Sequence, residues 1–206
     1  MSISKNNKIL SHITSVFDRQ AYNYNAASNR LPWSWQRRRE ASIVSSLIGN
    51  ITGLHALDLG CGAGFYTRIL LSCGAQEVTA VDISPAMVSQ LPKERVTGVV
   101  GDVETVQFNK QFDIIICAGM LEFTPDPRRV LDNARNQIID GGFMIVLGPV
   151  AGFCGRLYFL YHKLHGLHIH LFDVTNLRDL AESTRWRVNK IIRIFPFTLI
   201  MRLDAP

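Results

Sequence analysis

The chain has 206 residues, of which 47% are hydrophobic and 19% charged, and its net charge is +5. This balance excludes an intrinsically disordered chain, and the length suits one domain with a sizeable core. We therefore expect a single domain over residues 1–206. The cysteines show no metal-ligand spacing and no C-x-x-C pair, so we interpret them as reduced thiols of a cytoplasmic protein. They are Cys61, Cys73, Cys117 and Cys154.

The positive charge is concentrated at one end of the chain. Residues 1–40 hold seven Lys and Arg against two acidic residues, whereas the remainder holds 15 of each sign. This distribution argues against a nucleic-acid-binding face spread over the domain. The basic segment is either a solvated helix face or a surface that attracts an acidic substrate, a carrier protein or a membrane.

The sequence predicts neither a leader peptide nor a membrane span. Met1–Leu10 carries two lysines but lacks the apolar core of a signal peptide. The most apolar window, Phe143–Tyr161, is broken by glycines and a proline and contains Arg156, whereas a span needs about 20 mostly apolar residues.

Hydrophobic patterning predicts helices at the start of the chain and then alternating strands and helices. Residues 1–54 are expected to form a helical cover, interrupted at Leu31-Pro32. The expected strands are Ala56–Leu59, Val78–Val81, Val96–Val100, Phe112–Cys117, Phe143–Leu147, Trp186–Ile194 and Thr198–Leu203. The expected helices between them are Gly64–Ser72, Ala86–Leu91, Arg128–Ile139 and Asn176–Ser183. Continuous apolar strands separated by helices indicate an α/β fold with a mostly parallel sheet, and the last two strands indicate an antiparallel hairpin.

Three alternating glycines mark the turn after the first strand. The stretch His55–Thr67 reads H-A-L-D-L-G-C-G-A-G-F-Y-T, and exposed N–H groups at the following helix start favour a carboxylate or phosphate. The spacing differs from the dinucleotide pattern G-x-G-x-x-G/A. Asp58 inside the strand would repel a pyrophosphate and suits a ligand that carries an ammonium group.

Two further acids follow strands two and three. Asp82 comes 18 residues after Gly64, where a carboxylate can accept both hydroxyls of a ribose or cap the next helix. Asp102 follows the third strand, either as a ligand-binding acid or as a turn aspartate. Because ligands bind beyond the carboxyl ends of strands in open α/β sheets, we expect these acids near the glycine turn.

The stretch L-D-L-G-C-G-A-G-F-Y-T resembles the first motif of class I S-adenosylmethionine (SAM) methyltransferases, and the later motifs occur in the same order. The resemblance implies a Rossmann-like three-layer α/β sandwich with a seven-stranded sheet and SAM as cofactor. It also implies cofactor-binding residues in each of these motifs, from the N-terminal segment to the end of the fourth strand. They are Tyr24 (with Tyr22 as the alternative register), Arg30, Asp58, Gly60, Cys61, Gly62, Gly64, Asp82, Ile83, Asp102, Val103, Ala118 and Gly119.

Within that set, the resemblance assigns each group of residues to one part of SAM. The glycine turn would cradle the methionine end, and Tyr24 in F-D-x-x-A-x-x-Y would reach its carboxylate. Asp102 would accept from the adenine amino group while the Val103 N–H contacts the ring. The small residues after the fourth strand would turn backbone carbonyls toward the methionine ammonium.

The catalytic residues are less well defined. Phe123 stands where some relatives have a histidine base, which counts against metal-assisted or histidine-based O-methylation of the quinone-precursor type. Glu122 is either a pocket carboxylate or a helix-capping group. Residues 148–175 form an expected substrate-side insertion, whose His162 and His165 are candidate general bases. Its H-x-x-H-x-x-H-x-H pattern lacks a completing cysteine or carboxylate, so we expect no metal.

The sequence thus predicts methyl transfer from SAM to an oxygen or nitrogen of a small, partly apolar molecule that can be anionic. Two alternatives remain open: another use of SAM by the same fold, such as its cyclisation, and SAM binding without catalysis. A nucleic-acid substrate is disfavoured, because Ala118-Gly119-Met120-Leu121 replaces an N/D-P-P-Y-type motif. The oligomeric state stays open.

Overall fold

The computed structural model describes residues 10–19, 21, 33–164, 167 and 169–206. The sheet has seven strands in the order β3-β2-β1-β4-β5-β7-β6. The chain divides into two compact units, Met1–Asp102 and Val103–Pro206, and each is described by itself. The predicted α/β class with seven strands is confirmed.

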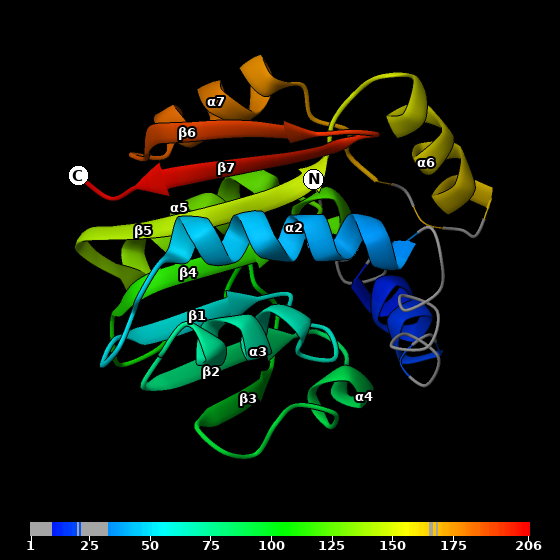
Figure 1. Ribbon diagram of the computed structural model, residues 1–206. Coiled ribbons are helices and arrows are strands. Elements are labelled where there is room, and N and C mark those ends of the chain that lie inside the picture. Colours follow the sequence, from blue (N-terminus) through cyan, green and yellow to red (C-terminus); the bar gives the residue numbers. More distant parts are fainter. Residues whose placement is uncertain (1–9, 20, 22–32, 165–166, 168) are drawn as a thin grey trace. The chain divides into compact units, whose positions relative to one another are not determined.

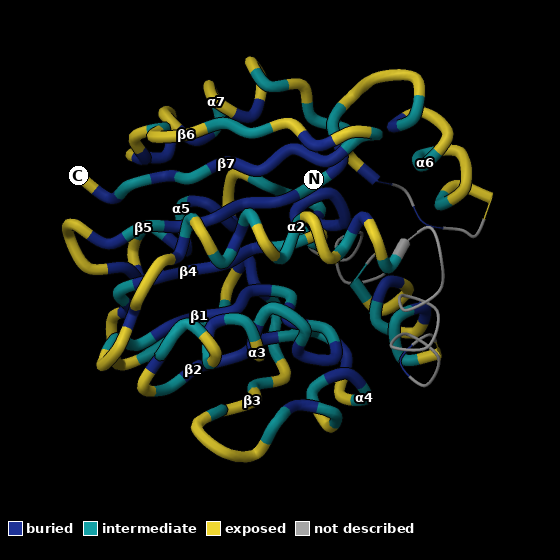
Figure 2. The backbone as a smooth tube through the Cα atoms, viewed as in Figure 1, coloured by how far each residue is buried: buried dark blue, intermediate teal, exposed yellow. Residues whose placement is uncertain are grey.

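Unit 1 is a three-stranded parallel sheet with helices, preceded by a helix over residues 10–19 (Figure 1). Its other elements are α2 (Trp33–Ile48), β1 (His55–Leu59), α3 (Phe65–Ser72), β2 (Glu77–Asp82), α4 (Pro85–Val88) and β3 (Val96–Val100). All but the first residue of β1 are buried, whereas β3 is largely exposed at the sheet edge. The apolar runs of β1 and β2 therefore form the core of this unit, as Figure 2 shows in dark blue.

The N-terminal helix packs on the α4 side of unit 1. Ala21 is buried in a cluster with Ala63 and Met87, and Phe17 packs against it. Gln90 Nε2 donates a hydrogen bond of 3.0 Å to the Ala21 carbonyl. Phe17 and Ala21 of the expected helical cover are therefore packed against the glycine turn at Ala63.

Unit 2 joins a parallel strand pair to the antiparallel hairpin. Its elements are β4 (Phe112–Ala118), η1 (Leu121–Phe123), α5 (Pro127–Gln137), β5 (Ile138–Pro149), α6 (Phe153–Leu164), α7 (Val174–Ser183), β6 (Arg187–Ile194) and β7 (Thr198–Asp204). β4 pairs with β5 in parallel, and β7 pairs antiparallel with both β5 and β6. The predicted closing hairpin is confirmed.

Several predicted boundaries in unit 2 are wrong, and β5 begins at Ile138 rather than Phe143. The helix expected to reach Ile139 ends at Gln137, and Ile138 instead pairs with Phe112 as the first residue of β5. The β-branched pair Ile138-Ile139 favours this extended conformation. The later helix starts at Val174 rather than Asn176, because the carboxylate of Asp173 accepts the Asn176 N–H at 2.7 Å and caps it.

α4 is also shorter than expected. It ends at Val88 rather than Leu91. Ser84 caps its start, because Ser84 Oγ accepts the Met87 N–H at 3.1 Å, and Pro85 is the first helical residue. Leu91 then turns inward and is buried in a cluster with Cys61 and Ala80. Burial of Leu91 under the glycine turn thus ends the helix early.

Among the described residues, none of the helices has both the length and the apolarity that crossing a membrane requires. All four cysteines are free.

Candidate functional site

The loop between β1 and α3 has a backbone that favours glycine at three positions. Gly60, Gly62 and Gly64 have φ values of 71°, 51° and 83°, in the left-handed region. A Cβ on Gly64 would also lie 2.8 Å from a methyl carbon of Leu91. The loop delivers the chain directly to the first turn of α3, where N–H groups have no acceptor within the helix. Such a turn can accept an anionic group.

Asp82 joins the end of β2 to this loop. Its carboxylate accepts the Gly62 N–H at 2.8 Å and the Ser84 N–H at 2.9 Å. Burial raises the pKa of Asp82, and these backbone N–H groups oppose the shift. The structure therefore brings Asp82 and the glycine loop together, with Ile83 next to them in the chain. The Asp82 carbonyl also accepts the Gly101 N–H at 3.0 Å, which fixes the backbone just before Asp102.

Asp58 lies behind the loop rather than on its surface. Its side chain is 1% exposed and accepts a 2.6 Å hydrogen bond from the Thr67 hydroxyl on α3. Burial raises the pKa of Asp58 to about 7, with the Thr67 bond opposing the shift. Burial also raises the pKa of the Cys61 thiol, so this residue is a neutral thiol near neutral pH.

Arg68 also holds the loop, and the sequence reading missed it. One guanidinium nitrogen, Nη1, donates to the carbonyls of Ala63 and Gly64, both at 2.8 Å. It follows the glycine turn by one helical turn, which is the spacing at which a side chain can reach back to the loop carbonyls. The position of Arg68, four residues after the last motif glycine, was the feature of the sequence that could have predicted this contact.

Asp18 is a second residue that the sequence reading missed. Its carboxylate accepts the Ser84 hydroxyl and, at 3.4 Å, the Ala86 N–H at the start of α4. It belongs to the F-D-x-x-A-x-x-Y stretch, in which only the tyrosine was singled out. The described part of that motif therefore anchors the N-terminal helix to the loop that follows Asp82.

Unit 2 contains the predicted cofactor positions Val103, Ala118 and Gly119. Asn133 Nδ2 donates to the carbonyls of Val103 and Val106 at 3.0 and 2.9 Å, which fixes the backbone around Val103. Ala118 ends β4, and Gly119 follows with φ 63° and its N–H bonded to the Leu147 carbonyl at 2.9 Å. Among the residues that the structure describes, no atom lies within 4 Å of the Cβ position of Gly119. Its backbone is thus held on one side and open on the other.

The candidate base His162 lies on α6 in an aromatic setting. Its ring centroid is 4.4 Å from that of Tyr158 and 5.3 Å from those of Phe123 and Tyr161. The helix therefore brings an imidazole next to Phe123.

Glu122 is buried at 1% exposure, and the Cβ position of Gly148 lies 3.5 Å from its Oε2. Its carbonyl accepts the His170 N–H at 2.7 Å, which ties the segment after α6 to η1. Of its two predicted roles, capping of α5 falls to another residue: the Asp126 carboxylate accepts the N–H groups of Arg128 and Arg129 at that helix start.

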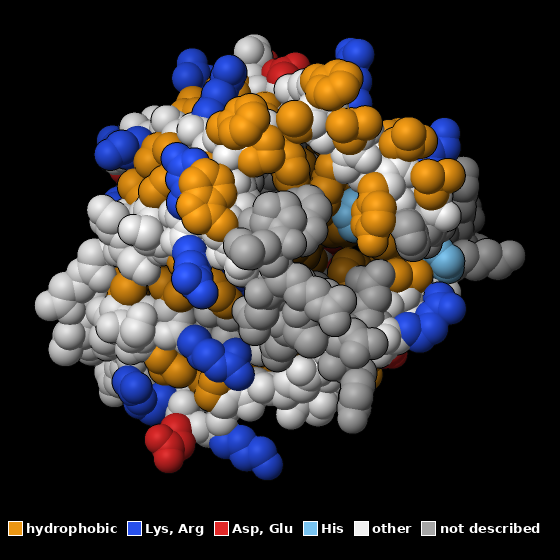
Figure 3. All heavy atoms as spheres, turned by 45° about the vertical axis from the view of Figure 1, so that its right-hand side comes forward, with side chains coloured by type: hydrophobic (Ala, Val, Ile, Leu, Met, Phe, Trp, Pro, Cys, Tyr) orange, Lys and Arg blue, Asp and Glu red, His pale blue; other side chains and the backbone are white. Residues whose placement is uncertain are grey.

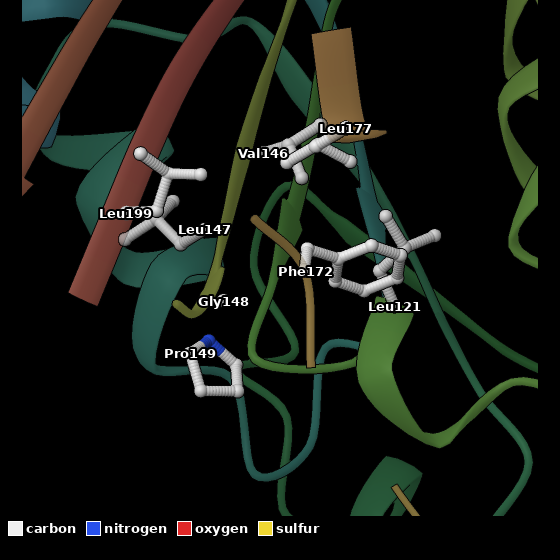
Figure 4. Close-up of a pocket in the computed structure, with 8 residues that line it drawn as sticks. All are labelled: Leu121, Val146, Leu147, Gly148, Pro149, Phe172, Leu177 and Leu199. Carbon is white, nitrogen blue, oxygen red and sulfur yellow. The ribbon is translucent and has the colours of Figure 1, made fainter. Parts of the chain in front are cut away.

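A small apolar cavity lies between β5, β7 and the segment that precedes α7 (Figure 4). Its lining residues are Leu121, Val146, Leu147, Gly148, Pro149, Phe172, Leu177 and Leu199. It belongs to unit 2 alone and adjoins η1 through Leu121.

Three of the predicted site residues, Tyr24, Arg30 and His165, lie outside the described residues, as does the alternative Tyr22. Across the described ranges, no cluster of three or more His, Cys, Asp or Glu side chains is arranged to hold a metal ion.

A family model described as "Methyltransferase domain" matches residues 57–146. The ubiquinone biosynthesis O-methyltransferase of Coxiella burnetii strain RSA 493 is 34% identical over 162 residues, covering 72% of this chain and 67% of that protein. The enzyme of the same name from Shewanella halifaxensis is 27% identical over 187 residues, covering 78% of each.

Solved structures with S-adenosylhomocysteine have the same fold. The N-methyltransferase NodS of Bradyrhizobium japonicum matches with a TM-score of 0.75 at 15% identity, covering 94% of this chain and 98% of that one. The magnesium protoporphyrin IX methyltransferase of Synechocystis matches with a TM-score of 0.76 at 15% identity, covering 96% and 100%.

Proposed function

Because the chain belongs to the SAM-dependent methyltransferases, we propose that it methylates an oxygen or nitrogen of a small, partly apolar molecule that can carry an anionic group. The observation that carries this proposal is the imidazole of His162, enclosed by Phe123, Tyr158 and Tyr161. Aromatic rings suit an apolar acceptor, and an imidazole suits removal of its proton.

The residues of unit 1 fit the methionine and ribose parts of SAM. The left-handed glycines leave no Cβ between the loop backbone and a ligand, and the α3 start favours the methionine carboxylate. Asp82 would accept the ribose hydroxyls with oxygens that also hold the loop. Asp102 and the Val103 N–H would bind adenine, and the carbonyls of Ala118 and Gly119 would face the ammonium group.

Asp58 would act through its neighbours. A carboxylate that is 1% exposed and bonded to Thr67 fixes the approach of β1 to α3 and so the shape of the glycine loop. We therefore propose a positioning role for it. Tyr24 and Arg30 stay predictions for the methionine carboxylate.

SAM supplies a methyl group on a sulfonium that is already activated for transfer. The protein's main task is then alignment, and proximity can contribute about 7–11 kcal/mol. For a hydroxyl acceptor, an imidazole nitrogen of His162 would take the proton as the new O–CH3 bond forms, while the S–CH3 bond breaks and S-adenosylhomocysteine is left. An amine acceptor attacks through its own lone pair, so it needs no base before the step.

The apolar surroundings support an acceptor with an aromatic or aliphatic part. The ring of Phe197 lies 5.2 Å from that of Tyr158, and the cavity of Figure 4 is lined by apolar side chains. Arg156 and Lys163 on the same helix would favour an acceptor with a carboxylate or phosphate.

We also propose a cytoplasmic location, in keeping with the four free thiols.

The test is a pair of acceptor panels, amphipathic phenols and amphipathic amines, each incubated with SAM while S-adenosylhomocysteine is measured. With a phenol, His162→Gln should lower kcat roughly 100-fold near pH 7 and recover at alkaline pH, where the acceptor ionises without a base. Amine methylation should be unaffected, and His170→Gln is the matched control. A parallel loss with phenols and amines at every pH would remove His162 from the base role.

A further inference from the structure

The two edge strands of the seven-stranded sheet differ in how they are protected. β6, at one edge, exposes Arg187, Lys190 and Arg193 and has a register shift between Val188 and Lys190. Charged side chains and bulges are devices that keep an edge strand from pairing with another chain. β3, at the other edge, reads V-T-G-V-V without a charged residue, and its pairing with β2 has no register shift. An unprotected edge rich in β-branched residues can accept a further strand.

The outer side of β3 is open. β3 is the lowest strand in Figure 1, and Thr97, Gly98 and Val100 are exposed, as the tube of Figure 2 shows. The side chain of Val100 stands out among the apolar ones, since this residue is 53% exposed. Within the described ranges of the chain, β2 is the only strand that pairs with β3. The free edge of β3 therefore presents both backbone groups and apolar side chains.

The register of β3 on β2 determines which backbone groups face outward. The Arg95 carbonyl accepts a hydrogen bond from β2 at 2.9 Å, and the Gly101 N–H donates one to β2 at 3.0 Å. Backbone groups alternate in direction along a strand, so the odd-numbered residues bond to β2. Val96, Gly98 and Val100 consequently direct their N–H and C=O groups away from the sheet.

We propose that β3 pairs antiparallel with β3 of a second copy of this chain, about a two-fold axis at Gly98. In that register Gly98 faces the partner's Gly98, and Val96 faces the partner's Val100. All the outward N–H and C=O groups then meet as hydrogen-bonded pairs. The exposed side chain of Val100 also gains a cross-strand neighbour in the partner's Val96. A two-fold contact is complete with two copies, so it joins two sheets without forming a filament.

Charge favours a second copy in this orientation. Lys93, Glu94 and Arg95 precede β3 and are exposed with a net positive charge, whereas Asp102 follows the strand. Antiparallel pairing brings the positive start of one strand beside the acidic end of the other, and parallel pairing would bring like charges together. Figure 3, turned about the vertical axis, keeps β3 lowest and shows basic and acidic side chains along the lower edge of the surface. The inference goes beyond the proposed reaction and stands on unit 1 alone.

The first experiment is sedimentation velocity of the full chain from about 1 to about 200 µM. The wild type should pass from monomer to dimer as its concentration rises. Val100→Pro removes an outward N–H that β2 does not use, so the strand should remain in its sheet while dimerisation weakens roughly tenfold or more. Val100→Thr keeps this N–H and a β-branched side chain and is the matched control, which should dimerise like the wild type. Circular dichroism checks that each variant is folded.

The second experiment tests the register by cross-linking. Val96→Cys/Val100→Cys places thiols opposite each other across the two-fold axis, where paired Cα atoms lie about 5.5 Å apart and a disulfide can form. Mild oxidation should convert this variant into a covalent dimer. The wild type and each single variant should stay uncross-linked, because like positions are about 13 Å apart along the strands.

Three results would overturn the proposal. One is a wild type that stays monomeric at every concentration. Another is a dimer that persists undiminished in Val100→Pro, because a different surface would then hold the two copies together. The third is a double-cysteine variant that dimerises without cross-linking, because its β3 strands would then not be paired about Gly98.

Discussion

The glycine loop at residues 60–64 and helix α6 are held in place by different kinds of interaction. The loop is fixed by charged side chains, with Asp82 binding its Gly62 N–H and Arg68 binding two of its carbonyls. α6 is fixed by ring contacts and by the close approach of Gly155 to Val150, and its apolar residues face outward. A loop that is fixed by specific hydrogen bonds suits recognition of one ligand. An exposed apolar helix face has no such directional contacts and suits less specific binding.

The largest expected effect is a loss of SAM affinity when the glycine loop is altered. Asp82→Ala removes an acceptor from two backbone N–H groups, each bond to a charged group contributing about 1.5–3 kcal/mol. We expect SAM affinity to fall about 100-fold in titration calorimetry. Asp132→Ala, which removes a half-buried carboxylate of α5 near Arg128, is the control. Unchanged affinity in Asp82→Ala would separate the carboxylate from cofactor binding.

The second effect concerns Asp58 and pH. Its pKa is about 7 in the folded protein and about 3.9 in the unfolded chain. Between these values the folded state retains the proton and the unfolded state loses it, so stability falls as pH rises from about 4 to about 7, by up to about 1.4 kcal/mol per pH unit.

Asp58→Asn should make this fall shallower and raise the free energy of unfolding at pH 8, because the amide oxygen can still accept the Thr67 hydroxyl. Urea unfolding at pH 5, 6, 7 and 8 measures it. Some slope should remain, since burial also raises the pKa of Asp82. Parallel curves for wild type and variant would contradict the account of Asp58.

The third effect tests the docking of α6. Gly155→Ala places a methyl group against the Val150 carbonyl and should destabilise the helix by about 1–3 kcal/mol. Hydrogen exchange should then increase across residues 153–164. A methyl group in Gly152→Ala meets no atom of the described part of the chain within 4 Å, so this variant should leave exchange unchanged. Equal protection in the two variants would mean that the close approach at Gly155 does not hold the helix.

The smallest effect again concerns the loop. Arg68→Ala removes both guanidinium bonds to the loop carbonyls, and we expect S-adenosylhomocysteine affinity to fall about tenfold. Arg68→Lys should recover part of the loss, because an ammonium group can still reach one carbonyl. If Arg68→Ala binds as tightly as the wild type, the loop holds its conformation without this side chain.

The sequence predicted the fold well because its signals are local. Glycines at alternate positions and the continuous apolar strands each determine the conformation of a few neighbouring residues. The boundary at Ile138 was wrong because pairing with Phe112, a partner distant in the chain, decides it.

The contacts that hold the site could not be predicted in the same way. The bond from Ser84 to Asp18 joins residues 66 positions apart, and the contact of Phe123 with His162 depends on how α6 docks. The outward direction of the Phe153–Leu164 stripe was also hidden, because an apolar helical pattern is read as the buried face. The close packing of Gly155 against the Val150 carbonyl turns the other side of the helix inward and so leaves the apolar stripe exposed.

The central claim is most directly tested by product analysis with the full chain, SAM and an amphipathic phenol or amine acceptor. We expect S-adenosylhomocysteine in amounts equal to the methylated acceptor, and none above background when the acceptor is left out. Formation of methylthioadenosine would indicate another use of SAM, and tight SAM binding without turnover on any acceptor would indicate a binding protein; either result would contradict methyl transfer.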